Sequence, residues 1–156
     1  MAPENYHPSL HRLAVITACV ALLPVTFGAL TTSRGAGMAF PDWPTSDGYS
    51  MLFYPWFQSI ADSNKFLEHG HRLAGALIGM FSIALAYVTW KRDSRLSVTI
   101  MSFVVLLSVI AQGILGGMRV LENDARLAMY HGLFASLVFA LMTGIAIATG
   151  KRWLEA

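Results

Sequence analysis

The stretch Glu68-His69-Gly70-His71-Arg72 places an acid, two imidazoles and a guanidinium within five residues, directly before an apolar run. At helical spacing, Glu68 shares one face with His71 and with Arg72. His69 lies about 200° around the helix from His71, so the two imidazoles cannot serve one ligand together. One histidine of this pair is therefore expected to face inward, beside a carboxylate.

Two glycines, Gly75 and Gly79, follow His71 at steps of four residues and so lie on the same helix face. They leave a flat strip beneath the imidazole, against which a planar ring such as a haem can lie. The alternative is that the glycines let a second helix approach closely. The spacing alone is compatible with both.

Four runs without Asp, Glu, Lys or Arg indicate which elements must position these groups. They cover residues 13–33, 73–90, 96–118 and 127–150. At ~1.5 Å per residue, each is near the length that crosses ~30 Å of hydrocarbon. The first run has the flanks of a signal peptide, but its length and the central Pro24 favour a retained helix. We predict an all-α integral membrane four-helix bundle, a single domain over 1–156, with helices at about 13–33, 69–90, 96–118 and 127–150.

The distribution of charge predicts the orientation in the bilayer. Basic residues cluster at one set of helix ends: Arg12, Lys91, Arg92, Arg95, Lys151 and Arg152. The opposite loops carry four, Arg34, Lys65, Arg119 and Arg126. By the positive-inside rule both termini are cytoplasmic, and a bacterial inner membrane is the expected location. The net charge of +2 is too small to indicate a nucleic-acid partner.

The connection 34–67 is expected to form a long outer loop rich in aromatic residues and proline. Aromatic side chains concentrate at the membrane–water boundary, and residues 50–60 are predicted to lie along it. The loop is either an aromatic belt without chemistry or a lid over a site that opens outward. Loops of this length are more often functional.

A weak internal repeat relates the two halves of the chain. Gly28-x5-Arg34 matches Gly113-x5-Arg119, and the residues around His71 match those around His131. The repeat predicts two pseudo-symmetric helical hairpins, with His71 and His131 at the same depth. Two histidines on different helices of a bundle can bind a metal from opposite sides, as in six-coordinate haem ligation.

Other readings of these residues stay open. A zinc site needs three or four ligands, and only Glu68 offers itself as a third. A lone intramembrane histidine is commonly an interhelical hydrogen-bond partner. Arg34 and Arg119 could pair with haem propionates or with phosphate headgroups. The single cysteine, Cys19, allows no intramolecular disulfide and no cysteine-based metal site.

Four motifs occur together and in order: Glu68-x-x-His71-Arg72, the loop 37–44 (GMAFPDWP), the run 112–120 (QGILGGMRV) and His131-Gly132. In this combination the chain resembles the haem A synthase family of cytochrome oxidase assembly proteins, from about Arg12 to Gly150. Members of that family are typically two fused four-helix bundles. The resemblance is to the amino-terminal, catalytic bundle.

The resemblance implies that Glu68 is the catalytic glutamate and that His71 and His131 are the axial ligands of the substrate haem. It also implies a reaction in which a methyl group of haem O is hydroxylated twice and loses water, which leaves the formyl group of haem A. Arg34, Arg72, Gly75 and Arg119 are the expected haem-binding residues. Glu68 could instead serve only as an ion-pair partner of Arg72.

The chain also departs from the family pattern. Because the sequence runs only to Ala156, we do not expect it to contain the second bundle with its haem b, the presumed electron relay. It also holds no cysteine in the outer loop, where many family members carry a pair. We therefore expect a homo-oligomer, a second four-helix chain or another electron donor as partner, besides the lipid bilayer. The alternative function is a non-catalytic haem-binding or oxidase-assembly protein, or one half of a two-chain enzyme.

Overall fold

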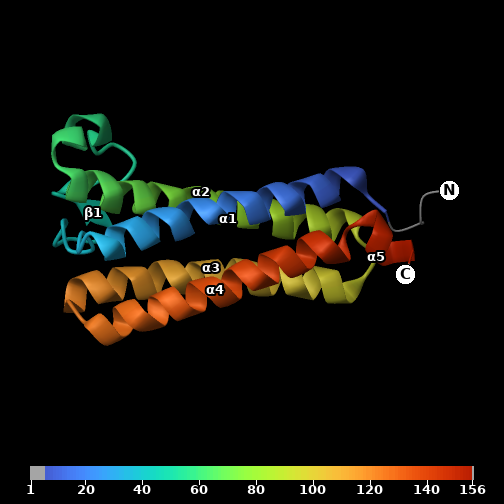
Figure 1. Cartoon of the computed structure of the whole chain (residues 1–156). Helices are drawn as coiled ribbons and strands as arrows, with labels where there is room; N and C mark the ends of the chain where they lie inside the picture. Colours follow the sequence, from blue (N-terminus) through green and yellow to red (C-terminus); the bar gives the residue numbers. More distant parts are fainter. Residues whose placement is uncertain (1–5, 156) are drawn as a thin grey trace.

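The computed structural model describes residues 6–155, so residues 1–5 of the N-terminal tail and Ala156 lie outside it. Four long helices run alternately up and down: α1 (Pro8–Ser33), α2 (Ser63–Arg92), α3 (Leu96–Glu122) and α4 (Ala125–Ala148) (Figure 1). Each is long and apolar enough to cross a membrane. The predicted all-α membrane bundle is confirmed. We call its two ends the loop end, which carries residues 34–62, and the termini end.

The helices extend beyond the apolar runs from which they were predicted. α1 begins at Pro8 instead of residue 13, because proline in the first turn has no N–H that needs a partner. α2 begins at Ser63 instead of residue 69, since the Asp62 carboxylate accepts the N–H groups of Asn64 and Lys65. An apolar run marks the part of a helix that crosses hydrocarbon, whereas caps set its ends.

The second hairpin differs from its predicted bounds in the same way. α3 continues to Glu122 instead of residue 118, and Asp124 caps the start of α4 by accepting the N–H of Arg126. α4 ends at Ala148, two residues early. The sequence did not predict the short helix that follows it, α5 (Lys151–Glu155).

The bundle consists of two hairpins, α1 with α2 and α3 with α4, packed side by side (Figure 1). Leu85, Val105 and Ile145 have no exposed surface and lie in its apolar core. Thr17, Ser82 and Thr89 are buried as well, and their hydroxyls donate to carbonyls of their own helices. This core fills the termini half and leaves the loop-end half for a site.

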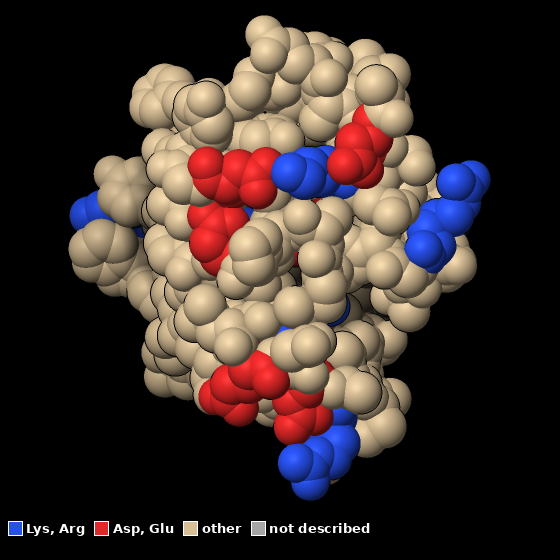
Figure 2. Space-filling view, turned by 90° about the vertical axis from the view of Figure 1, so that its left-hand side faces the viewer, with Lys and Arg blue, Asp and Glu red and all other residues tan. Residues whose placement is uncertain are grey.

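The connection at the loop end is ordered by its own hydrogen bonds. β1 (Thr45–Ser46) pairs with β2 (Tyr49–Ser50) through Asp47 and Gly48, whose positive φ angles of 50° and 78° suit a type I′ turn. The Asp42 carboxylate accepts the N–H groups of both turn residues. The 3-10 helix η1 (Trp56–Ala61) follows, in the stretch predicted to lie at the interface. Seen end-on, this face is mostly uncharged, with acidic and basic groups in small clusters (Figure 2).

At the termini end, an ion pair orders the connection between α2 and α3 and anchors it to the end of α4. The Asp93 carboxylate is buried and lies 2.7 Å from Nη2 of Arg95, whose Nη1 donates to the carbonyl of Ala148 at 2.8 Å. Burial raises the pKa of Asp93, but the hydrogen bonds and charge of Arg95 outweigh it, so the pKa lies below its ordinary value of 3.8.

Candidate haem-binding site

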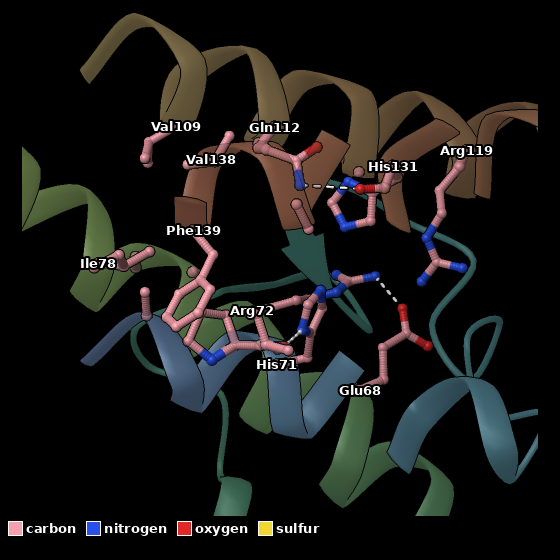
Figure 3. Close-up of a pocket in the computed structure, with 18 of the residues that line it drawn as sticks. Glu68, His71, Arg72, Ile78, Val109, Gln112, Arg119, His131, Val138 and Phe139 are labelled. Carbon is pink, nitrogen blue, oxygen red and sulfur yellow. Dashed lines mark hydrogen bonds and ion pairs between the residues drawn. The ribbon is translucent and has the colours of Figure 1, made fainter. Parts of the chain in front are cut away.

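A cavity of about 320 Å³ lies between the two hairpins and reaches the loop end (Figure 3). All four long helices line it, and Trp43 and Met51 of the connection line it at the loop end. Its wall is mostly apolar, with small residues on both sides. The polar lining residues are Glu68, His71, Arg72, Gln112, Arg119 and His131, together with the indole of Trp43.

His71 is held in one orientation by α1. Its Nδ1 donates to the carbonyl oxygen of Pro24 at 2.9 Å, and since a carbonyl only accepts, the proton is on Nδ1. This leaves Nε2 with a free lone pair, the arrangement that metal-binding histidines usually have. The ring fits because position 28 is glycine: a Cβ there would lie 3.0 Å from Cε1 of His71.

His131 lies opposite, on α4, against another glycine. A Cβ at Gly116 would lie 3.0 Å from Cε1 of His131. The ring centroids of His71 and His131 are 5.9 Å apart, and the rings are nearly perpendicular. Gln112 donates to the backbone carbonyl of His131 at 3.0 Å, while Nδ1 of His131 is buried without a hydrogen-bond partner among residues 6–155. The structure thus brings the two predicted ligands together.

The structural repeat has a different register from the sequence repeat. The sequence pairs Gly28 with Gly113, but in the structure Gly116 faces His131 as Gly28 faces His71. This one-turn shift places Thr31, not Arg34, at the position equivalent to Arg119. The shift follows from packing, because each glycine must lie where the imidazole of the neighbouring helix needs space.

Glu68 is fully buried at the loop end and closes the connection over the cavity. One carboxylate oxygen lies 2.8 Å from Nη2 of Arg72, and the other accepts the N–H groups of Ala39 and Phe40 at 2.7 and 3.2 Å. Arg72 also donates to the carbonyl oxygens of Asp42 and Thr45. The ion pair considered from the sequence is present. Glu68 holds residues 39–40 of the loop, and Arg72 holds residues 42 and 45.

The two arginines proposed for propionates lie in different places. Arg119 is half-buried and lines the cavity, and within the described part of the chain its guanidinium has no hydrogen-bond or ion-pair partner. A Cβ at Gly37 would lie 2.6 Å from its Nη1, so the loop packs directly against it. Arg34 is exposed at the end of α1 and does not line the cavity. Of these two arginines, only Arg119 therefore lies where it could pair with an anionic group in the cavity.

The remaining residues of the motif separate as the helical spacing predicts. His69 points away from the cavity, into a cluster with Phe40, Tyr54 and Trp56, and its Nδ1 lies 3.2 Å from the hydroxyl of Ser46. Gly75 lines the cavity, whereas Gly79 does not. A Cβ at either glycine would meet nothing within 4 Å, so they do not serve a close helix approach.

The donor set fits a haem better than a protein-only metal site. Among the described residues, no group of three or more His, Cys, Asp or Glu side chains gathers, which leaves zinc without its usual ligands. A haem supplies its own equatorial nitrogens and needs only two axial ligands. Two imidazoles across an apolar cavity, with a free guanidinium at its mouth, match that need.

Sequence reasoning missed several residues that shape the site. Pro24 supplies the carbonyl for His71, and Gly28 and Gly116 supply the space for the two rings. Their signal was available, since Pro24-x3-Gly28 and Gln112-x3-Gly116 share one spacing. The contribution of Met51 had no sequence signal.

Comparisons with known proteins indicate the family of the chain. The family model described as cytochrome oxidase assembly protein, COX15-CtaA, matches residues 11–153. The chain is 31% identical over 147 residues to the Heme A synthase of Shouchella clausii, which covers 90% of this chain and 46% of that protein. It is 31% identical over 150 residues to the one from Symbiobacterium thermophilum (92% and 46%), and 30% over 151 residues to the one from Halalkalibacterium halodurans (93% and 49%).

The chain thus spans about half the length of the curated relatives it matches. No solved structure matches it at a significant level. The match to the family model extends over nearly the whole chain and includes all four helices and the cavity between them. The chain therefore belongs to the COX15-CtaA family of cytochrome oxidase assembly proteins.

Proposed function

We propose that this chain takes part in haem A biosynthesis, as an oxidoreductase of the haem A synthase type that converts a methyl group of haem O into the formyl group of haem A. The observation that carries the proposal is the pair of imidazoles, His71 and His131, 5.9 Å apart across an apolar cavity. The names of the relatives support the substrate class.

In this proposal the haem supplies the iron and is itself the substrate, and the chain binds and orients it. His71 and His131 would hold the iron from two sides. Arg119 would pair with a propionate, because its cation lies at the cavity mouth without a partner among the described residues. Trp43 and Met51 would exclude water that enters from the loop end. Small residues such as Gly75 leave room for the flat ring.

Glu68 is the candidate for proton transfer or for stabilising positive charge near the reacting methyl group. Its carboxylate lines the cavity at the level of the loop. Its two oxygens already accept three hydrogen bonds, one from Arg72 and two from the N–H groups of Ala39 and Phe40. We therefore assign Glu68 two tasks, closing the loop and adjusting charge at the site.

These three hydrogen bonds to Glu68 also favour the second candidate, a non-catalytic haem-binding protein of oxidase assembly. A carboxylate that accepts from Arg72, Ala39 and Phe40 would serve that protein as a structural clasp. The haem would then be carried unchanged between the same histidines. Formation of product separates the two candidates.

The proposal also covers orientation and partners. The loop end would face the outer side of a bacterial inner membrane, with both termini cytoplasmic, because six basic residues gather at the termini end and five, Arg72 included, at the loop end. Oxidation of a methyl group removes electrons, so the reaction needs an oxidant and a redox relay, and a second copy or a second four-helix chain, carrying a haem b, could provide the relay. Reporter fusions to each terminus test the orientation.

The decisive experiment expresses the chain in cells that supply haem O, purifies it in detergent and analyses the extracted pigment by chromatography and mass spectrometry. Haem A or its hydroxylated precursor supports the oxidoreductase. Bound but unchanged haem O supports the carrier. If the purified wild-type protein contains no more haem than the His71→Ala and His131→Ala variants, the ligand assignment and both functions are wrong.

A further inference from the structure

A groove at the termini end lies at the other end of the bundle from the candidate haem site. Tyr6, together with His11 and Val15 of α1, forms one wall, and residues from Thr143 to Trp153 on α4 and α5 form the other. None of the lining residues lines the cavity between the hairpins. Figure 1 shows α5 beside the start of α1. We call this site the termini groove.

Contacts between the two ends of the chain hold the walls of the groove in place. Thr149 follows α4, and its hydroxyl donates to the carbonyl oxygen of Ile145 at 2.8 Å. Nδ1 of His11 lies 3.4 Å from the same hydroxyl oxygen, which joins α1 to the end of α4. Gly150 provides the room for this approach, because a Cβ there would lie 3.1 Å from the carbonyl oxygen of Ile147 and 3.4 Å from Cε1 of His11. The groove is therefore a defined feature of the fold.

The termini groove is apolar at one end and basic at the other. Val15 and Ile147 are exposed and line the end nearer the middle of the bundle. Lys151 and Arg152 line the opposite end, beside the exposed indole of Trp153. Tryptophan is enriched where hydrocarbon meets the headgroups. The groove thus suits a molecule that has an apolar chain and an anionic head.

The change from apolar to basic coincides with the expected edge of the hydrocarbon. The apolar run 127–150 ends at Gly150, directly before the two basic residues. At ~1.5 Å per residue, Ile147 and Thr143 lie about 5 and 10 Å inside that edge, and one leaflet contributes about 15 Å of hydrocarbon. Thr143 offers no free donor at this depth, since its hydroxyl donates to the carbonyl oxygen of Phe139. The groove therefore runs from headgroup level into the region of the acyl chains.

The basic end carries cations that the chain leaves largely free. Arg152 has no hydrogen-bond or ion-pair partner within residues 6–155. Lys151 lies 3.5 Å from Glu155, but the two side chains are 52% and 47% exposed, and such exposed ion pairs are weak. Among the described residues, no Asp or Glu lines the groove. An anion that enters the groove therefore meets net positive charge.

We propose that the termini groove binds an anionic phospholipid, with its phosphate at Lys151 and Arg152 and an acyl chain along Val15 and Ile147. Guanidinium and ammonium groups bind phosphate oxygens through charge-assisted hydrogen bonds, and basic pockets between membrane helices suit lipid headgroups. A free phosphate would leave the apolar end unfilled, and a zwitterionic lipid brings an ammonium group that Arg152 repels. The inference goes beyond the proposed function and does not depend on haem binding.

The test equilibrates the full chain in detergent with equal amounts of dioleoyl phosphatidylglycerol and dioleoyl phosphatidylethanolamine. These lipids share their acyl chains and phosphate but differ in net charge. Gel filtration isolates the protein, and mass spectrometry gives the ratio of the two retained lipids. Each basic residue near an anionic headgroup contributes about fivefold to binding. We therefore expect the wild type to retain phosphatidylglycerol over phosphatidylethanolamine by about tenfold or more.

Lys151→Gln/Arg152→Gln should bring this ratio to about twofold or less, because both cations of the groove are lost. The matched control is Arg12→Gln/Lys91→Gln, which removes the same two charges from exposed positions at the termini end, outside the groove. The control should keep the ratio within about threefold of wild type. All four side chains are exposed, and thermal unfolding verifies that both variants fold. Arg152→Gln alone serves if the double variant does not fold.

Equal retention of the two lipids by the wild type would overturn the proposal. An equal loss in the control variant would overturn it too, since the summed charge of the termini end, and not the groove, would then attract the lipid. Displacement of phosphatidylglycerol by millimolar inorganic phosphate would show that the cations bind a free anion, which rejects the lipid as occupant. Retention of the lipid in phosphate, with its loss only from the groove variant, supports the site.

Discussion

Nδ1 of His71 donates a hydrogen bond to the carbonyl oxygen of Pro24 at 2.9 Å, across the interface of α1 and α2. The contact sets the tautomer of the imidazole and aims Nε2 into the cavity. It depends on Gly28, one turn further along α1, because any Cβ there would press on the ring. Substitutions at Gly28, Arg119 and Glu68 test the site, and a substitution at Asp93 tests the termini end.

Gly28→Ala should displace the His71 ring by a few tenths of an ångström and weaken its bond to Pro24. We expect haem affinity to fall about tenfold, the effect of losing ~1.4 kcal/mol of ligand positioning, with a changed low-spin spectrum. The control is Gly79→Ala, where a Cβ meets nothing within 4 Å. Optical titration of both variants decides, and equal affinities would refute the proposed role of Gly28.

Arg119→Gln should weaken haem binding, because it removes the free cation at the cavity mouth. A hydrogen bond to a charged group is worth ~1.5–3 kcal/mol, so affinity should fall about tenfold or more. Arg34→Gln is the matched control, since Arg34 is exposed and outside the cavity. If Arg34→Gln weakens binding as much as Arg119→Gln, the propionate assignment is wrong.

Glu68→Gln should keep haem bound and stop formyl formation. The amide oxygen can still accept the N–H groups of Ala39 and Phe40, so the loop stays closed, but the charge facing Arg72 is lost. Pigment extraction and mass analysis give the yield of haem A. A full yield would show that the Glu68 carboxylate has no catalytic task.

Comparing Glu68→Ala with Glu68→Gln separates the hydrogen bonds that Glu68 makes to the loop from the charge of its carboxylate. It leaves the N–H groups of Ala39 and Phe40 without their acceptor, so the connection 34–62 should open. We expect limited proteolysis to cut this connection at least tenfold faster than in Glu68→Gln. Equal cleavage of the two variants would argue against the clasp.

Asp93→Asn should destabilise the termini end by about 2 kcal/mol at pH 7, since it removes a charged hydrogen-bond acceptor from Arg95. The lowered pKa of Asp93 sets the pH dependence. A carboxyl whose pKa is depressed in the folded state contributes stability above its unfolded pKa and loses it as pH falls through the folded one. The contribution is thus complete above about pH 5, begins to fall near the unfolded pKa of about 4, and is lost as the pH drops through the folded pKa, which lies below 3.8.

Thermal unfolding in detergent at pH 7 and pH 3 measures this contribution. The difference in melting temperature between wild type and Asp93→Asn should be larger at pH 7 than at pH 3. Asp124→Asn is the matched control, because its partner Arg126 is 82% exposed and asparagine still caps α4. A gap that stays constant with pH would contradict the assignment.

The sequence by itself determined the membrane fold and the identity of the central residues. Apolar runs of the right length specify spanning helices, because helical hydrogen bonding and hydrocarbon thickness are local constraints. The spacing of His69 and His71 likewise predicted that only one of the two imidazoles faces inward, since the angular position of a residue on a helix follows from its number. The repeat that matches His71 with His131 indicated which one. Motif order indicated the family before any contact was known.

Only the tertiary structure decided which turns of different helices face each other. The sequence repeat paired Arg34 with Arg119, but packing of Gly28 and Gly116 against the two imidazoles shifts the register by one turn and leaves Arg34 outside. The closure of the loop by Glu68 and the extent of the cavity between the hairpins also depend on contacts between distant segments. Such contacts are set by the fit of side chains across helix interfaces, which no local spacing specifies.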